Sequence, residues 1–107
     1  MIFNDWQQKG IGKEISKSLL WEYDLSNFDW NDMRTLVVKR VIETGWIDDF
    51  YAAIKLYGGI ENFQNIIKEI PSLSHKDINF VCTVFNLNKQ ELKCYTRTLL
   101  REKLLNS

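Results

Sequence analysis

Two pairs of carboxylates are the residues of this sequence whose type and spacing could support chemistry. Asp29 with Asp32, and Asp48 with Asp49, are close enough in sequence to bind a divalent cation or to share a proton. Each pair also lies where a helix is expected to begin. Carboxylates at that place accept hydrogen bonds from free backbone N–H groups and offset the helix dipole. We therefore interpret both pairs as helix caps.

The remaining chemical candidates are one histidine and two cysteines. His75 follows a capping serine at an expected helix start, and no evident partner orients it as a general base. Cys82 and Cys94 form neither a CxxC pair nor a zinc-type cluster with histidine, so we expect reduced thiols. The sequence has no phosphate-loop, dinucleotide-binding, zinc-protease or nucleophile-elbow motif. We therefore predict that the protein is not an enzyme and binds no metal or cofactor.

A glycine turn in the stretch AAIKLYGGIENFQNII resembles a helix-turn-helix, which makes DNA binding an alternative. The second helix of this stretch offers four side chains that could contact DNA: Asn62, Gln64, Asn65 and Lys68. A helix that recognises DNA bases normally carries Lys or Arg side chains that contact the phosphates. Here two acids, Glu61 and Glu69, outnumber the single base Lys68. A DNA contact would therefore depend more on the basic C-terminal residues than on this helix.

Charge is unevenly distributed along the chain, although the formal net charge is zero. A net charge of zero argues against a surface that is drawn as a whole to nucleic acid or acidic lipid. Residues 19–50 carry seven acids against three bases, whereas residues 89–103 carry five bases against two acids. The basic block makes Arg97, Arg101 and Lys103 candidates for contact with an acidic partner or with phosphate.

Aromatic residues are abundant, with 4 Trp, 4 Tyr and 6 Phe in 107 residues. Four of them alternate with acids in the stretch WEYDLSNFDW: Trp21, Tyr23, Phe28 and Trp30. Rigid aromatic side chains commonly carry interface energy, but they also dominate hydrophobic cores. Both interpretations therefore stay open for these four residues, an anchor for a partner protein or ordinary core.

Hydrophobic periodicity predicts an all-α fold, a compact bundle of about five to six short helices with a helix-turn-helix-like centre as an option. A helix capped by Asp29 and a second helix up to Gly58 form the central pair. Gly45 between them is expected to be left-handed, so that alanine there would cost about 1 kcal/mol. Residues 1–14 are interpreted as an irregular arm because Gly10 and Gly12 interrupt the pattern. Residues 15–107 form a single helical domain that includes a basic C-terminal helix.

The beginning of the sequence is too polar for a signal peptide. No apolar run approaches the length that spans a bilayer. We therefore expect a cytoplasmic protein without membrane contact. No pattern in the sequence indicates an oligomeric state.

Three stretches between residues 19 and 95 resemble a family of small bacterial proteins of unknown function: LLWEYDLSNFDW, VVKRVIETGWIDDFYAAIKLYG and LSHKDINFVCTVFNL. Members of that family are often encoded beside nucleotidyltransferase toxins of the abortive-infection type. The resemblance implies an antitoxin-like partner protein that could also regulate its own operon, and it supplies no catalytic residue.

The leading hypothesis is a binding module that neutralises a cognate toxin by direct contact. A nucleotidyltransferase site is lined by carboxylates that hold magnesium, so a basic helix carrying Arg97, Arg101 and Lys103 could mask it. Trp21, Tyr23, Phe28 and Trp30 are the candidate aromatic anchor for that contact. The alternative hypothesis is a helix-turn-helix-like DNA-binding transcriptional regulator.

Overall fold

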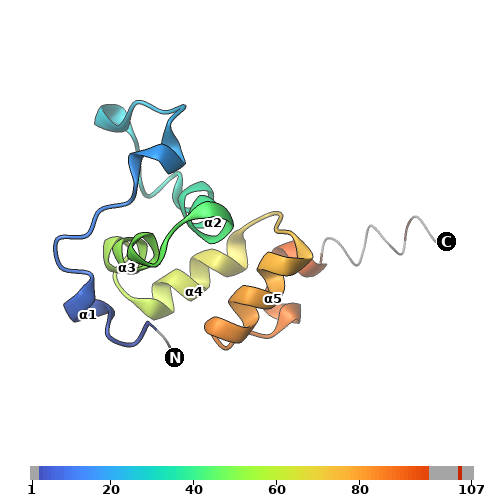
Figure 1. Cartoon of the computed structure of the whole chain (residues 1–107). Coiled ribbons are helices and arrows are strands. Elements are labelled where there is room, and N and C mark those ends of the chain that lie inside the picture. Colours follow the sequence, from blue (N-terminus) through green and yellow to red (C-terminus); the bar gives the residue numbers. More distant parts are fainter. Residues whose placement is uncertain (1–2, 97–103, 105–107) are drawn as a thin grey trace.

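The computed structural model describes residues 3–96 and Leu104, and its regular elements are all helices (Figure 1). In chain order they are α1 (Trp6–Lys9), the 3-10 helices η1 (Lys17–Leu20) and η2 (Leu25–Asn27), α2 (Arg34–Thr44), α3 (Ile47–Leu56), α4 (Ile60–Glu69), α5 (His75–Val84) and the 3-10 helix η3 (Lys89–Glu91). Residues 93–96 are also helical. The described residues contain no β-strand, and the predicted all-α fold class is confirmed.

Helix α2 is the central element, as the sequence indicated. It packs against η1, α3, α4 and α5, and Figure 1 shows it between the η1–η2 segment and α4. Val37, Val38 and Val41 on its buried face are at most 1% exposed. Burial of a valine side chain stabilises a fold by about 1.5 to 3 kcal/mol, so this stripe is a main contributor to the core.

The beginning of α2 differs from the sequence prediction. The Asp29 carboxylate accepts hydrogen bonds from the backbone N–H groups of Asn31 (3.1 Å) and Asp32 (3.0 Å). These bonds stabilise a turn rather than the first turn of the helix, which begins at Arg34. Trp30 therefore lies in the turn ahead of α2, not on its buried face.

The turn between α3 and α4 depends on a glycine pair. Gly58 and Gly59 have φ values of +89° and +125°, and an L side chain rarely adopts such a backbone conformation. Gly45 was predicted to share this property, and that prediction is wrong because its φ is −75°. Position 45 requires glycine for another reason, the lack of space for a Cβ atom. A Cβ atom there would lie 2.6 Å from the carbonyl oxygen of Val41, in the last turn of α2.

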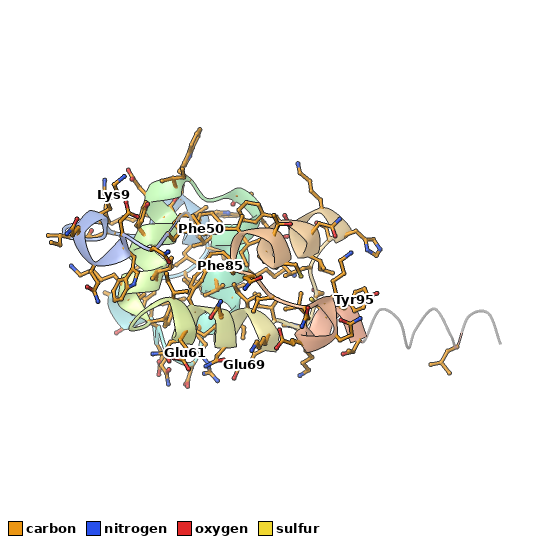
Figure 2. All side chains as sticks on the ribbon, turned by 90° about the horizontal axis from the view of Figure 1, so that it is seen from below. Lys9, Phe50, Glu61, Glu69, Phe85 and Tyr95 are labelled. Carbon is orange, nitrogen blue, oxygen red and sulfur yellow. The ribbon has the colours of Figure 1, made fainter. Side chains whose placement is uncertain are left out.

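The core is rich in aromatic rings supplied by distant parts of the chain. Phe85 of the α5 end lies with its ring centroid 5.2 Å from that of Phe63 in α4 and 6.4 Å from that of Phe50 in α3. Figure 2 shows Phe50 and Phe85 inside the bundle, whereas Lys9, Glu61 and Glu69 lie at its edge. Ring pairs at such distances add to the burial energy of their side chains. The core therefore joins α3, α4 and α5 directly.

The N-terminal segment is more structured than the irregular arm expected for residues 1–14. Residues 6–9 form one helical turn, α1, which lies against α3. Phe3 is 2% exposed, and its ring centroid lies 5.2 Å from that of Phe50 and 5.5 Å from that of Phe85. The segment therefore contributes a side chain to the core, although Gly10 and Gly12 interrupt its sequence pattern.

Asp49 ties this segment to the first turn of α3. Its carboxylate accepts hydrogen bonds from the Ser16 backbone N–H, the Ser16 hydroxyl and the Trp46 backbone N–H, each at 2.8 Å. Asp49 is 1% exposed and is the one buried charged residue among those that the structure describes. A buried carboxylate needs such donors to offset its desolvation. The interpretation of Asp49 as a helix-capping residue is confirmed.

In the part of the chain covered by residues 3–96 and 104, no helix combines the length and apolar character needed to cross a membrane.

Candidate protein-binding surface

Three of the four aromatic residues singled out by the sequence contact one another ahead of α2. The ring centroids of Tyr23 and Phe28 are 5.5 Å apart, and those of Phe28 and Trp30 are 4.7 Å apart. Both pairs are edge-to-face, an arrangement favoured by the ring quadrupoles. Phe28 and Trp30 also pack against the core, whereas Tyr23 is 37% exposed. We call these three residues the aromatic ladder. It extends from the core to the solvent.

Trp21 lies beside the ladder in sequence and has a side chain that is 79% exposed. Residues before and after it are held by Arg40 of α2, whose guanidinium donates a hydrogen bond to the Leu19 carbonyl (2.9 Å) and pairs with the Glu22 side chain. The chain is therefore fixed on both sides of an indole that faces water. An exposed indole gains little from folding, and tryptophan is enriched among the residues that carry interface energy.

The acids between these aromatics form turns. The Asp24 carboxylate accepts hydrogen bonds from the Ser26 hydroxyl (2.7 Å) and the Ser26 backbone N–H (3.1 Å), and these donors lower the pKa of Asp24. The backbone N–H of Asp32 likewise lowers the pKa of Asp29. Both carboxylates are therefore held in the charged form by local donors. Their role in this geometry is to hold η2 and the turn that carries Trp30.

A groove lies between α3 and the segments that precede α2. Its main hollow has a volume of about 330 Å³ and is lined by Lys13, Glu14, Ile15, Lys17, Leu25, Trp30, Ala52 and Leu56. Two neighbouring hollows share Leu56 with it, one toward Gly58 and one toward Lys55. We call these adjoining hollows the α3 groove. Leu56 is 47% exposed and Trp30 joins the groove to the aromatic ladder.

A polar cluster occupies the other side of the N-terminal segment. The Tyr51 hydroxyl donates a hydrogen bond to Asp5 (2.7 Å) and lowers the pKa of that carboxyl, and Lys9 pairs with the same carboxylate at 3.2 Å. Lys13 and Asp48 form a second pair at 3.1 Å. These contacts connect the N-terminal segment to α3. The cluster is therefore explained by attachment of this segment.

The four candidate DNA-contact residues of α4 have different environments. The Asn62 side chain donates to the Tyr57 carbonyl (3.0 Å), and the Gln64 side chain donates to the Phe85 carbonyl (2.6 Å). Lys68 pairs with Glu91 of η3 at 3.7 Å, whereas Asn65 is exposed. Three of the four therefore already have partners within the fold. A side chain that must leave such a partner to read a base edge loses that hydrogen bond.

The basic candidates Arg97, Arg101 and Lys103 lie outside the described residues. Within residues 3–96 and 104, no three His, Cys, Asp or Glu side chains are grouped so that they could hold a metal ion. His75 is exposed in the first turn of α5, as expected for a residue after the Ser74 cap. The surface around the aromatic ladder and the α3 groove is therefore the candidate site.

Several residues of this surface were not predicted from the sequence, among them Leu56, Lys17 and Lys55. A signal for Leu56 was present, because it is an apolar residue outside the buried stripe of α3 that contains Phe50 and Ile54. An apolar residue off that stripe must either face another element or stay exposed. The lysines carried no such signal, because exposed cations are common on any helical surface.

A family model described as a family of unknown function (DUF6922) matches residues 15–67 of the chain. The matched part runs from Ile15 through most of α4. It includes the aromatic ladder and most of the residues that line the α3 groove. No curated protein and no solved structure matches the chain. The resemblance to a family of unknown function, drawn from the sequence over residues 19–95, is therefore supported over residues 15–67.

Proposed function

We propose that this protein is a binding module that contacts a partner protein through Trp21 and the aromatic ladder. The observation that carries the proposal is the 79% exposure of Trp21 two positions before Tyr23 of the ladder, between residues Leu19 and Glu22 that Arg40 holds in place. Exposed tryptophan and tyrosine residues supply large contact areas with few rotatable bonds, so binding orders them at low entropic cost. Tyr23 continues the exposed surface toward the half-buried Phe28 and Trp30.

In its finer form, the proposal assigns an antitoxin-like role in the cytoplasm. The partner is then a nucleotidyltransferase-type toxin, which the protein neutralises by direct contact. The support is the sequence resemblance to small bacterial proteins encoded beside such toxins. A rigid aromatic anchor suits this role because a neutralising complex must persist, and buried aromatics lower dissociation rates.

The experiment is co-expression with the product of the adjacent gene, which the proposal expects to be a nucleotidyltransferase, followed by co-purification and titration calorimetry. Trp21→Ser is expected to weaken the complex by about 10-fold or more, since interface tryptophans are the residues that most often contribute above 1 kcal/mol. Trp46→Ser is the matched control, because the Trp46 side chain is equally exposed, at 79%, but lies at the start of α3.

Two results would contradict the proposal. The first is the absence of any complex when both proteins are folded and mixed at micromolar concentrations. The second is a complex that is weakened by Trp46→Ser and unchanged by Trp21→Ser, which would place the contact elsewhere. Circular dichroism of both variants checks that each keeps its helical fold.

The DNA-binding alternative rests on one observation, the short glycine turn that joins α3 and α4. A gel shift on the promoter of its own operon at physiological salt tests this alternative. Asn65→Ala should lower a sequence-specific shift, because Asn65 is exposed on α4 and the side chains of Asn62, Gln64 and Lys68 have contacts within the fold. A specific, salt-sensitive shift without any protein complex would replace the binding-module proposal.

A further inference from the structure

We propose that the α3 groove receives an amphipathic segment of the partner protein, one with an apolar stripe bordered by carboxylates. This inference rests on the proposed function, and it adds the place and the chemistry of the docking contact. Trp30 connects the groove to the surface of the proposed function, because it belongs to the aromatic ladder and also lines the groove.

Most of the residues that line the main hollow of the groove are apolar. Ile15 and Leu25 come from the segments before α2, while Ala52 and Leu56 come from α3. Ala52 is 4% exposed, and its short side chain leaves room for the hollow between α3 and the segments before α2. Leu56 is 47% exposed and lines all three adjoining hollows, so an apolar side chain from a partner would cover it. Apolar grooves along a helix are a common receptor for amphipathic segments.

The charge around the groove favours an acidic partner. Lys17 and Lys55 both line the α3 groove, and neither has an ion-pair partner among the described residues. Lys13 also lines the groove, but it forms an ion pair with Asp48. Glu14 is the one acid among the residues that line the main hollow. Two unpaired lysines, Lys17 and Lys55, against the one acid Glu14 are complementary to carboxylates at the edges of an apolar stripe.

Both walls of the groove are fixed before any partner arrives. The wall of residues 13–17 is attached to α3 through the hydrogen bonds from Ser16 to the buried Asp49 carboxylate. Trp30, which lines another part of the same side, is attached to the end of α3 through the Tyr57 hydroxyl, which donates to the Trp30 carbonyl at 2.8 Å. A preformed groove binds with a smaller entropic cost than a flexible surface, so these contacts support a docking role.

The probe is a synthetic helical peptide of about 15 residues with one stripe of leucines bordered by glutamates. Its binding to the full chain is measured by fluorescence anisotropy, and its place is read from the tryptophan indole N–H signals in NMR spectra. Trp30 is assigned with the variant Trp30→Phe. The Trp30 signal should move on titration, whereas the Trp46 signal should not, because Trp46 is not among the residues that line the groove.

Three variants test the chemistry of the groove. Leu56→Ser and the double change Lys17→Glu with Lys55→Glu should each weaken peptide binding by about 10-fold. Lys76→Glu is the matched charge control, since Lys76 is an exposed lysine in the first turn of α5, and it should change binding by less than about 2-fold. A peptide with lysines in place of the glutamates should bind more weakly to the unmodified protein and more strongly to the double variant.

Failure of this inference is distinct from failure of the proposed function. Equal binding of the acidic and basic peptides, or a shift of the Trp46 signal without Trp30, would overturn the groove assignment. If the natural partner then binds the groove variants normally but loses affinity with Trp21→Ser, the proposed function stands without the groove. If the partner does not bind at all while the peptide binds as expected, the groove is retained and the partner is wrong.

Discussion

Asp49→Asn should be among the most destabilising isosteric changes in this protein. The Asp49 carboxylate is 1% exposed and accepts three hydrogen bonds, two of them from Ser16 and one from the Trp46 backbone N–H. Asparagine keeps one acceptor oxygen, which can hold the two Ser16 donors on one side. Its amide nitrogen then faces the Trp46 N–H, so a donor meets a donor. We expect a loss of about 2 kcal/mol, since a hydrogen bond to a charged group contributes about 1.5 to 3 kcal/mol.

The assay is urea unfolding followed by far-UV circular dichroism. The free energy of unfolding should fall by about 2 kcal/mol with an unchanged m-value, and the melting temperature should fall by about 8 to 16 °C for a domain of this size. Asp48→Asn is the matched control, because the Asp48 side chain occupies the same helical turn but is 65% exposed in its pair with Lys13. Its loss should be about 0.5 kcal/mol, as is usual for exposed ion pairs.

A double-mutant cycle identifies the partner of Asp49. Ser16→Ala alone should cost about 1 kcal/mol because it removes the hydroxyl donor and keeps the backbone one. In the Asp49→Ala background its cost should be close to zero, because the acceptor is already absent. If Asp49→Asn and Asp48→Asn differ by less than about 0.5 kcal/mol, or if the Ser16 effect is unchanged in the Asp49→Ala background, the buried carboxylate does not hold the N-terminal segment as described.

Three further changes test the fold. Phe3→Ala should lower the free energy of unfolding by about 3 to 5 kcal/mol in urea titrations, because its ring is 2% exposed against Phe50 and Phe85; a loss below about 1 kcal/mol would mean that residue 3 is not in the core. Gly59→Ala should cost about 1 to 3 kcal/mol, since φ is +125°, and a neutral result in the same assay would exclude that backbone conformation. Burial raises the pKa of Tyr57 to about 12, so the stability that depends on its protonated hydroxyl is complete below pH 10 and is lost as pH rises from 10 through 12. Melting temperatures should therefore fall less steeply over this range in Tyr57→Phe, and identical slopes would contradict the burial of this hydroxyl.

The helices of the core were predictable because their information is local. Apolar residues at helical spacing indicated α2 to α5, and the capping serine Ser74 marked the start of α5, where its hydroxyl accepts from the Asp77 N–H. The position of Phe3 was not predictable in this way. Its burial depends on Phe50 and Phe85, which are distant in sequence, and no local pattern reports such contacts. The sequence of residues 1–14 therefore indicated irregular structure where the fold adds a turn of helix.

The candidate site was predictable in composition but not in geometry. The alternation of aromatics and acids singled out Trp21 and Trp30, but the same pattern fits core and interface equally. The structure separates them, since Trp21 is 79% exposed and Trp30 packs against the core. The groove could not be predicted, because it is built by Ile15, Leu25 and Leu56 from three segments. Only the tertiary arrangement brings these residues together.

The acidic block of residues 19–50 carries seven acids against three bases, and the structure shows how these acids are held. Five of its seven acids have partners within the fold: Glu22, Asp24, Asp29, Asp48 and Asp49. Asp24, Asp29 and Asp49 are committed to turns and caps by neutral donors and keep their charge, whereas Glu22 and Asp48 are paired with cations, and only these two pairings reduce the negative field that a partner would meet. What remains for recognition near this block is apolar and aromatic surface with lysines at the groove. A partner of this surface should consequently be selected by its apolar shape first and by its carboxylates second. Its affinity should then fall with salt only by the part that the lysines contribute, because exposed charges are screened by ions and apolar burial is not.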